Sequence, residues 1–235
     1  MKPITFNTTH WSVVLAAKGD NTRAYAALSE LCQSYRKPIL RYIEGAVRTG
    51  DSYDGHSYGG RSAEDLAHDF LVQLLEARLS GKGLLEHVQQ REGRFRIYLL
   101  GAVRYFLSNV RQQESATKRG GNIVHVPIPD NLSTTDNTTL FDREWAQTML
   151  DRAITLLGKA QETRMLLPWL TQEMTAEESE PLAMKLGKSE SAVKVALHRL
   201  RRKFRRLVRE QIAHTVESEK EIDAELDHLI RALTQ

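Results

Sequence analysis

Eight lysine and arginine side chains stand close together in the stretch SAVKVALHRLRRKFRRLVREQ. They fall between positions 194 and 209, with no acidic residue among them. A local concentration of one charge sign usually faces a partner of the other sign, and composition alone does not name that partner. Apolar residues recur at helical spacing in the same stretch, so it predicts a helix with one apolar and one basic face. The competing interpretation is a basic helix that faces only solvent.

The dipeptide His68-Asp69 is the best candidate for catalytic chemistry in this sequence. Metal-dependent phosphohydrolases of the HD class hold a divalent ion with such a pair on a helix, but they need further ligands at the same point. His56 and His87 are the candidates for those ligands. Cys32 is the only cysteine, so no internal disulfide and no cysteine-based metal site can form. Without a phosphate-binding glycine loop or a catalytic triad in context, we expect no enzyme activity, no metal and no cofactor.

The totals place the chain among globular proteins of one large or two small domains. It has 235 residues and a formal charge of only +3, so the basic stretch is a local feature. The first residues lack the apolar core of a signal peptide, and no apolar run reaches the ~18 residues that a membrane span needs. We expect a cytoplasmic protein without membrane contact.

Apolar periodicity predicts an all-α fold of two small helical domains. Helices are expected over 22–47, 62–80 and 95–115, and a new helical pattern starts at Phe141. Between the 95–115 helix and Phe141 lies a stretch without lysine or arginine that is rich in threonine and asparagine. Such a composition is typical of a flexible linker. The expected organisation is a first domain at 1–120, a linker at 121–140, a second domain at 141–213 and a C-terminal helix at 214–235.

The residues in front of the basic helix have the layout of a helix-turn-helix. Ala183 suits a tight helix crossing, Gly187 suits a turn with positive φ, and Val193 suits the core of the second helix. The start of that helix should reach base edges in a major groove, and its later part should contact phosphates. The base-reading candidates are Ser189, Ser191, Lys194, Val195 and His198, and the phosphate-binding candidates are Arg199, Arg201, Arg202 and Arg205.

The chain as a whole resembles the sigma factors of bacterial RNA polymerase, of the extracytoplasmic-function (ECF) type. AVKVALHRLRRKFRRL looks like the recognition helix of their region 4, which reads the minus-35 promoter element, and SAEDLAHDFLVQLLE is similar to region 2.2. FRIYLLGAVRYFLSNVRQQESATKRGG stands in the place of regions 2.3 and 2.4, which melt and read the minus-10 element. The resemblance extends over nearly the whole chain to about residue 213.

This resemblance implies a transcription initiation factor that binds the β′ clamp and the β flap of core RNA polymerase together with promoter DNA. It also allows for an anti-sigma factor as a regulatory partner. The clamp contacts would be Asp65, Leu66, Asp69, Phe70 and Gln73, and the contacts to the displaced minus-10 strand would be Arg94, Arg96, Tyr98, Arg104, Tyr105, Asn109 and Arg111. Core packing is the competing interpretation for the aromatic side chains of the 95–115 helix.

The sequence departs from the family pattern at two places. His68-Asp69 stands where the clamp helix usually has Gln-Glu, and Val195-Ala196 stands where region 4 often has Ser-Arg. The second departure puts the strength of direct base reading in doubt, although a valine can contact a thymine methyl. A dimeric helix-turn-helix repressor or activator remains the alternative function, and it would need an apolar dimer face on the 62–80 helix.

The C-terminal segment ESEKEIDAELDHLIRAL is acidic and has an apolar stripe at helical spacing. We hypothesise that this helix folds back on the chain, either on the basic helix or against the first domain, and restrains promoter binding. The alternative is a helix that only extends the C-terminal core.

Overall fold

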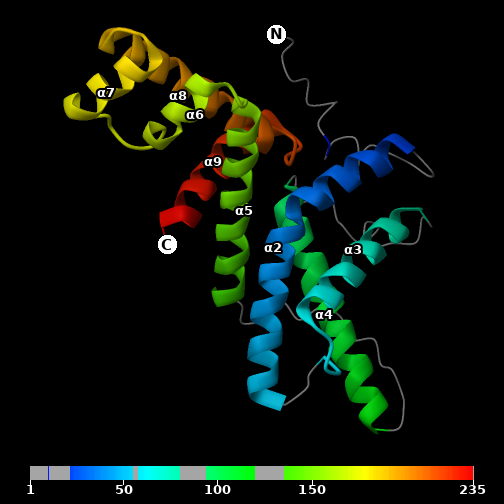
Figure 1. Ribbon diagram of the computed structural model, residues 1–235. Helices are drawn as coiled ribbons and strands as arrows, with labels where there is room; N and C mark the ends of the chain where they lie inside the picture. Colours follow the sequence, from blue (N-terminus) through cyan, green and yellow to red (C-terminus); the bar gives the residue numbers. More distant parts are fainter. Residues whose placement is uncertain (1–9, 11–21, 55–57, 80–93, 120–134, 235) are drawn as a thin grey trace. The chain divides into compact units, whose positions relative to one another are not determined.

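The computed structural model describes residues 10, 22–54, 58–79, 94–119 and 135–234 (Figure 1). Over these residues it has eight α-helices, one short 3₁₀ helix and no sheet, which confirms the prediction of an all-helical chain. The helices are α2 (Thr22–Asp54), α3 (Ala63–Leu79), α4 (Phe95–Arg119), α5 (Thr135–Leu157), α6 (Gln161–Leu166), α7 (Ala176–Leu186), α8 (Glu190–Ala213) and α9 (Glu219–Thr234), with the 3₁₀ helix η2 at Leu167–Trp169.

The described residues form two compact units. The first unit holds residues up to Thr148 together with those from Ala213 onward, and the second unit holds 149–212. Residues 141–148 and α9, which the sequence pattern placed outside the first domain, therefore belong to the first unit. Most of the expected linker lies outside the described residues, and α5 already begins at Thr135.

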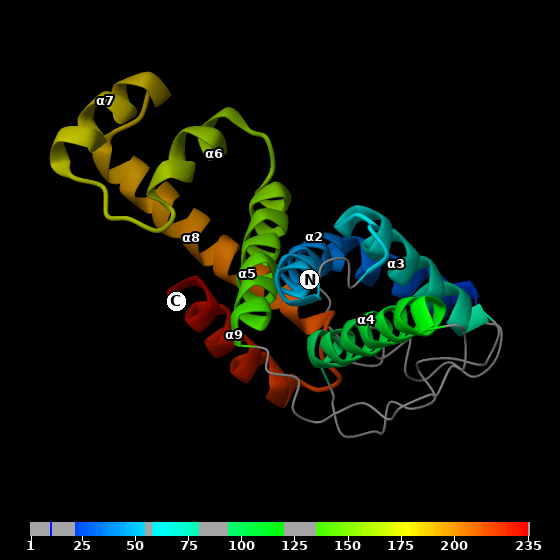
Figure 2. The same cartoon turned by 90° about the horizontal axis from the view of Figure 1, so that it is seen from below.

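The helices α2 and α4 and the first part of α5 lie side by side in the first unit (Figures 1 and 2), and aromatic contacts join them. Tyr35 of α2 meets the ring of Phe95 edge-on at 5.0 Å between centroids, and its hydroxyl accepts a hydrogen bond from Trp145 Nε1 at 3.0 Å. Both Tyr35 and Trp145 are fully buried. Edge-to-face aromatic pairs and paired polar atoms stabilise a core beyond the area they bury. The stripe of apolar residues on α2 that predicted this helix is the face that makes these contacts.

The helix α3 packs its apolar side into the same unit. Leu66, Phe70 and Leu74 are fully buried, and the Phe70 ring lies 5.6 Å from that of Phe106 on α4. Ser62 caps the helix, since its hydroxyl accepts from the backbone N–H of Asp65 at 3.1 Å. Ser62 therefore fixes where this helix begins.

Cys32 is buried on the apolar stripe of α2. Burial raises the pKa of its thiol to about 12, because the charged thiolate is disfavoured away from water. At neutral pH this group remains a protonated, small core residue, as expected from its position on the stripe.

Candidate nucleic-acid interface

A tight turn at Gly187 joins α7 to α8 in the second unit. Thr175 begins α7 with a capping box: its hydroxyl accepts from Glu178 N at 3.3 Å, and the Glu178 carboxylate accepts from Thr175 N at 2.8 Å. The backbone N–H and the hydroxyl of Thr175 both donate to the Glu178 carboxylate and thereby lower the pKa of this group. Gly187 ends the helix with φ of 61°, and Lys188 N donates to Ala183 O at 3.0 Å. A residue with positive φ after the last turn lets the following backbone N–H groups donate to the last carbonyl oxygens of the helix. Glycine suits this position because it adopts positive φ without strain.

We expect Gly187→Ala to lower the free energy of unfolding by about 1 kcal/mol, because a side chain is disfavoured in the left-handed region. A Cβ at this position would meet nothing within 4 Å, so the cost is conformational and not steric. Gly101, which lies exposed within α4 with equally open space, is the matched control. Gly101→Ala should raise stability by about 0.5–1 kcal/mol, since alanine favours a helix. Urea denaturation checks both, and two shifts of the same sign would contradict this explanation.

The helix α8 has one apolar and one basic face. Val193, Leu197 and Leu200 are buried against the rest of the unit. Lys194, His198, Arg199, Arg202 and Arg205 are exposed, as are Ser189, Ser191 and Val195 at its beginning. Ser189 caps the helix by accepting from Ala192 N at 3.3 Å. With the exception of Arg201, all residues that the sequence pattern assigned to duplex DNA are thus solvent-accessible on one helix and its cap.

Two cations of the basic stretch are used inside the second unit. Arg201 is half-buried, and its guanidinium donates to the carbonyl oxygens of Trp169 at 2.9 Å and Gln172 at 2.6 Å. Lys203 Nζ donates to Leu157 O at 3.0 Å. Both side chains therefore satisfy carbonyls at or just after helix ends, where a positive charge is favourable. Arg201, which the sequence pattern placed among the phosphate contacts, is thus engaged with these two carbonyl oxygens in the structure.

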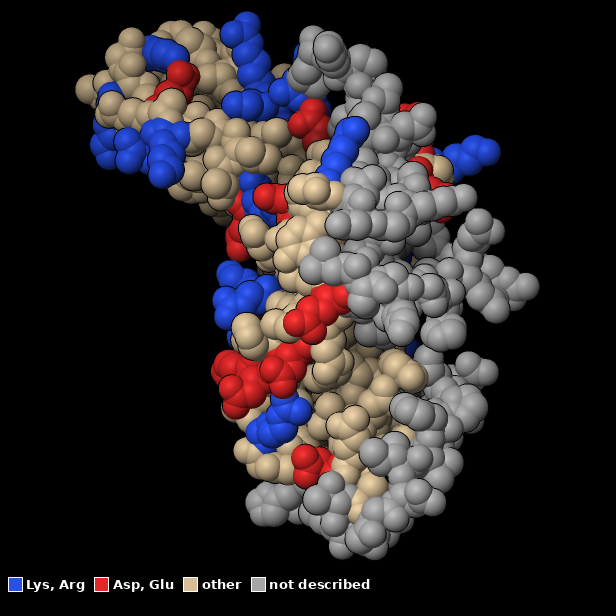
Figure 3. Space-filling model, turned by 90° about the vertical axis from the view of Figure 1, so that its right-hand side faces the viewer, with Lys and Arg blue, Asp and Glu red and all other residues tan. Residues whose placement is uncertain are grey.

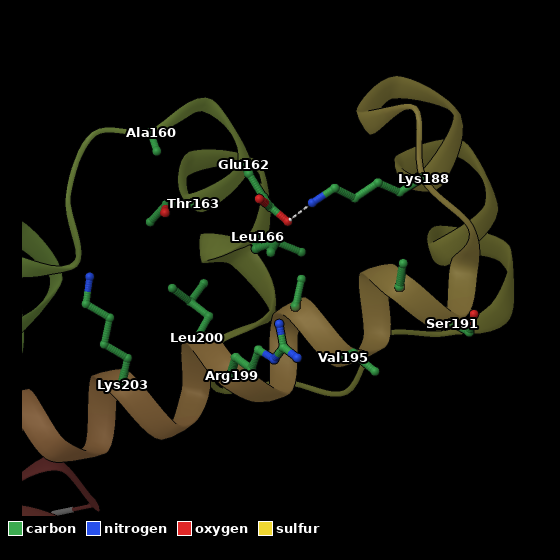
Figure 4. A pocket seen from close by; sticks show the side chains of 12 residues that line it. Ala160, Glu162, Thr163, Leu166, Lys188, Ser191, Val195, Arg199, Leu200 and Lys203 are labelled. Carbon is green, nitrogen blue, oxygen red and sulfur yellow. Dashed lines mark hydrogen bonds and ion pairs between the residues drawn. The ribbon is translucent and has the colours of Figure 1, made fainter.

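A groove of about 690 Å³ lies between α6 and α8 (Figure 4). Leu166 and Leu200 line it, and the exposed Val195 lies at its edge. Lys188 reaches across it to Glu162, with 2.6 Å between Nζ and Oε1. Arg199 and Lys203 add positive charge along the α8 side. An apolar lining with cations suits an acidic amphipathic segment, which makes this groove a second candidate surface of the unit.

The predicted polymerase contacts on α3 divide into solvent-accessible polar residues and buried apolar residues. Asp65 and Gln73 are exposed, and Asp69 is half-buried and forms an ion pair with Arg61. The two aspartates and the glutamine follow one another at four-residue spacing, so they share one stripe of the helix. Leu66 and Phe70 are fully buried and hold the helix on the unit. Only the polar members of the predicted set can therefore touch a partner directly.

The predicted contacts for the minus-10 strand, all on or next to α4, are mostly engaged within the first unit. Arg104 donates to Tyr42 Oη at 3.3 Å and to Thr138 Oγ1 at 2.9 Å, and Arg111 stacks over the Tyr58 ring at 4.8 Å. Tyr98 is 5% exposed, and burial raises the pKa of its hydroxyl. Tyr105 and Asn109 are half-exposed. For Tyr98, core packing is what the structure shows.

A buried ion cluster involves the remaining two arginines of this set. Arg96 is 6% exposed and Glu225 of α9 is fully buried. Arg96 Nε lies 3.1 Å from Glu225 Oε2, and its Nη1 lies 2.9 Å from Asp142 Oδ1. Burial alone would lower the pKa of Arg96, but the hydrogen bonds and negative charges of Glu225 and Asp142 raise it. The guanidinium therefore stays charged inside the unit.

Further contacts tie the same region together. Arg94 Nη1 lies 3.2 Å from Glu225 Oε1, and His228 Nε2 lies 3.0 Å from Asp142 Oδ2. The Arg96 guanidinium also stacks on the Trp145 ring at 5.3 Å. Sequence reasoning missed this cluster. The available signal was an acidic residue on the apolar stripe of the C-terminal segment, since Glu225 is buried beside Ile222 and Leu229.

No family model, curated protein or solved structure matches this chain. None of the described helices is long and apolar enough to cross a membrane.

The described residues contain no group of three or more His, Cys, Asp or Glu side chains arranged to hold a metal ion. His68 is exposed and Asp69 is paired with Arg61, while the suggested further ligands His56 and His87 lie outside the described residues. The face drawn in Figure 3 carries basic and acidic side chains interspersed.

Proposed function

We propose that this chain is a transcription initiation factor of the ECF sigma type, which binds core RNA polymerase and directs it to specific promoters. The observation that carries the proposal is the α7–α8 pair with its turn at Gly187, because α8 exposes Lys194, Arg199, Arg202 and Arg205 directly after that turn. As a helix-turn-helix, it would place α8 in a major groove. Lys194, Val195 and His198 would then reach base edges, and Arg199, Arg202 and Arg205 would contact phosphates.

The exposed side of α3 supports the polymerase-binding part of the proposal. Over 63–76, where side-chain burial is described, the exposed side chains are Glu64, Asp65, His68, Gln73 and Glu76. A dimeric repressor or activator would need an apolar face there, and this polar face favours docking to a basic surface such as the β′ clamp of the polymerase. The groove between α6 and α8 is a candidate for contact with the β flap, since its lining is apolar and cationic.

The minus-10 function rests on fewer residues than the resemblance implied. Tyr105 and Asn109 are accessible on α4 as the structure stands, whereas Arg94 and Arg96 are engaged with Glu225. An exposed tyrosine can stack on an unpaired base for roughly 1–3 kcal/mol. Tyr105 is therefore our first candidate for a contact with the displaced strand.

Capture of core polymerase by the tagged chain tests the proposal. We expect wild type to retain core polymerase and Asp65→Arg to lose at least about tenfold in affinity, because the substitution reverses a charge on the docking stripe. Glu64→Arg is the matched control, since it makes the same charge reversal in the first turn of α3 on a different stripe. Equal binding by the two variants would contradict the docking surface, and failure of wild type to retain polymerase would contradict the function.

A further inference from the structure

Two arginines of the first unit hold one carboxylate between them. Glu225 Oε1 lies 3.2 Å from Arg94 Nη1 and 3.1 Å from Arg96 Nη2, while Oε2 lies 3.1 Å from Arg96 Nε. Arg96 thus donates two parallel hydrogen bonds to the carboxylate, and Arg94 donates a third. This forked geometry fits a phosphate as well as it fits a carboxylate. The pair forms a built anion site that Glu225 occupies, and Asp142 contacts the remaining side of Arg96 at Nη1, 2.9 Å away.

The occupant comes from a helix that is distant in sequence. Arg96 and Glu225 are 129 positions apart, and α9 brings its acid to the site on a stripe whose other buried members are apolar. The chain just before α9 is also fixed to the start of α4, because Phe95 N donates to Thr215 O at 2.9 Å. Burying an acidic side chain on an apolar stripe costs desolvation energy. The same side chain makes the docking of α9 specific, because only a position beside two cations compensates its charge.

We propose that Glu225 stands in for a nucleic-acid phosphate, so that the first unit binds a DNA strand at Arg94 and Arg96 only after α9 has left. The inference rests on the proposed function, which supplies the reason for a single strand to reach α4. When α9 leaves, Glu225 returns to water and the arginines take a phosphate, so neither charge is left buried alone. The helix α9 thereby lowers the affinity of the isolated protein for DNA.

This exchange makes DNA binding and the docking of α9 mutually exclusive. A partner that binds α9 and removes it from the first unit would therefore restore the DNA affinity that the docked helix had lowered. Conversely, a strand bound at Arg94 and Arg96 would loosen α9. The apolar positions Ile230, at 59% exposure, and Leu233, at 36%, remain accessible on the docked helix.

Glu225→Gln tests the proposal in the full chain, because it keeps the side-chain shape and removes the competing charge. With a labelled single-stranded oligonucleotide of random sequence, we expect about fivefold to tenfold tighter binding than wild type by fluorescence anisotropy. The slope of log affinity against log salt should steepen by about 0.7, the value for one additional phosphate on a single strand. Adding Arg94→Gln and Arg96→Gln should cancel the gain.

Asp227→Asn is the matched control, since Asp227 is exposed on the same helix and the substitution also removes one negative charge. We expect less than about a twofold change from it. A Glu225→Gln variant that binds no more tightly than Asp227→Asn would overturn the proposal.

Hydrogen exchange on the wild-type protein provides the second measurement, and it decides the matter if the variant fails to fold. Saturating oligonucleotide should increase amide exchange over 222–232, and unchanged protection of α9 with the strand bound would also overturn the proposal. If these results are negative while core polymerase is still captured, only this inference fails. Loss of polymerase capture would instead remove the proposed function.

Discussion

Arg96→Ala is expected to lower the free energy of unfolding by about 3–5 kcal/mol, because it removes one partner from a buried ion cluster. Glu225 would keep only its contact with Arg94, and Asp142 only its contact with His228. The stacking of Arg96 on Trp145 would be lost as well. Urea denaturation followed by circular dichroism measures the effect, with Arg143→Ala as the control because Arg143 is an exposed arginine of the same unit. The control should stay within about 0.5 kcal/mol of wild type.

A double variant separates the loss of pairing from a loss of packing. In Arg96→Met/Glu225→Leu the buried pair is replaced by apolar side chains of similar size, and Asp142 keeps its contact with His228. Such replacements are often neutral, so most of the stability should return. If the double variant were as unstable as Arg96→Ala, the cluster would not stabilise the unit in the way described.

Removing three exposed arginines from α8 should have the largest effect on DNA binding. In Arg199→Ala/Arg202→Ala/Arg205→Ala, each lost phosphate contact should reduce the slope of log affinity against log salt by about 0.9, so the slope should fall by about 2.7. Affinity for duplex DNA should drop by about a hundredfold at moderate ionic strength. Anisotropy titrations over a series of salt concentrations measure both quantities.

Arg201→Ala is the control for this experiment, since Arg201 belongs to the same basic stretch but donates to Trp169 O and Gln172 O. It should lower the stability of the second unit and leave the salt slope unchanged. If Arg201→Ala reduced the slope as much as one third of the triple variant does, the assignment of exposed and structural arginines would be wrong.

Helices with a continuous apolar stripe were predictable because their signal is local. The apolar stripes of α2 and α3 predicted helices that the structure confirms, with differences at the ends. The beginning of α5 was not predictable in this way. Residues 135–140 are rich in threonine and polar residues, which is typical of a linker, but Thr138 accepts from Arg104 at 2.9 Å. Contact with another helix overrides the weak local preference there.

In the candidate site, too, the features with a local sequence signal were predictable and those that depend on distant contacts were not. Periodicity predicted the apolar and basic faces of α8, and Val193 and Gly187 take the structural positions expected of them. The roles of Arg201 and Arg96 depend on carbonyls and carboxylates that lie far away in the sequence, so no local pattern could predict them. Composition shows that a cation is present, and only the folded chain shows whether its partner is internal.

Transcription with purified components tests the central claim most directly. The chain is mixed with bacterial core RNA polymerase and genomic DNA, and the 5′ ends of the transcripts are sequenced. Our account predicts transcripts that start at a limited set of positions, share an upstream sequence element, and disappear in Arg199→Ala/Arg202→Ala/Arg205→Ala. If neither wild type nor Glu225→Gln directed transcripts beyond those of core polymerase alone, the account would be contradicted.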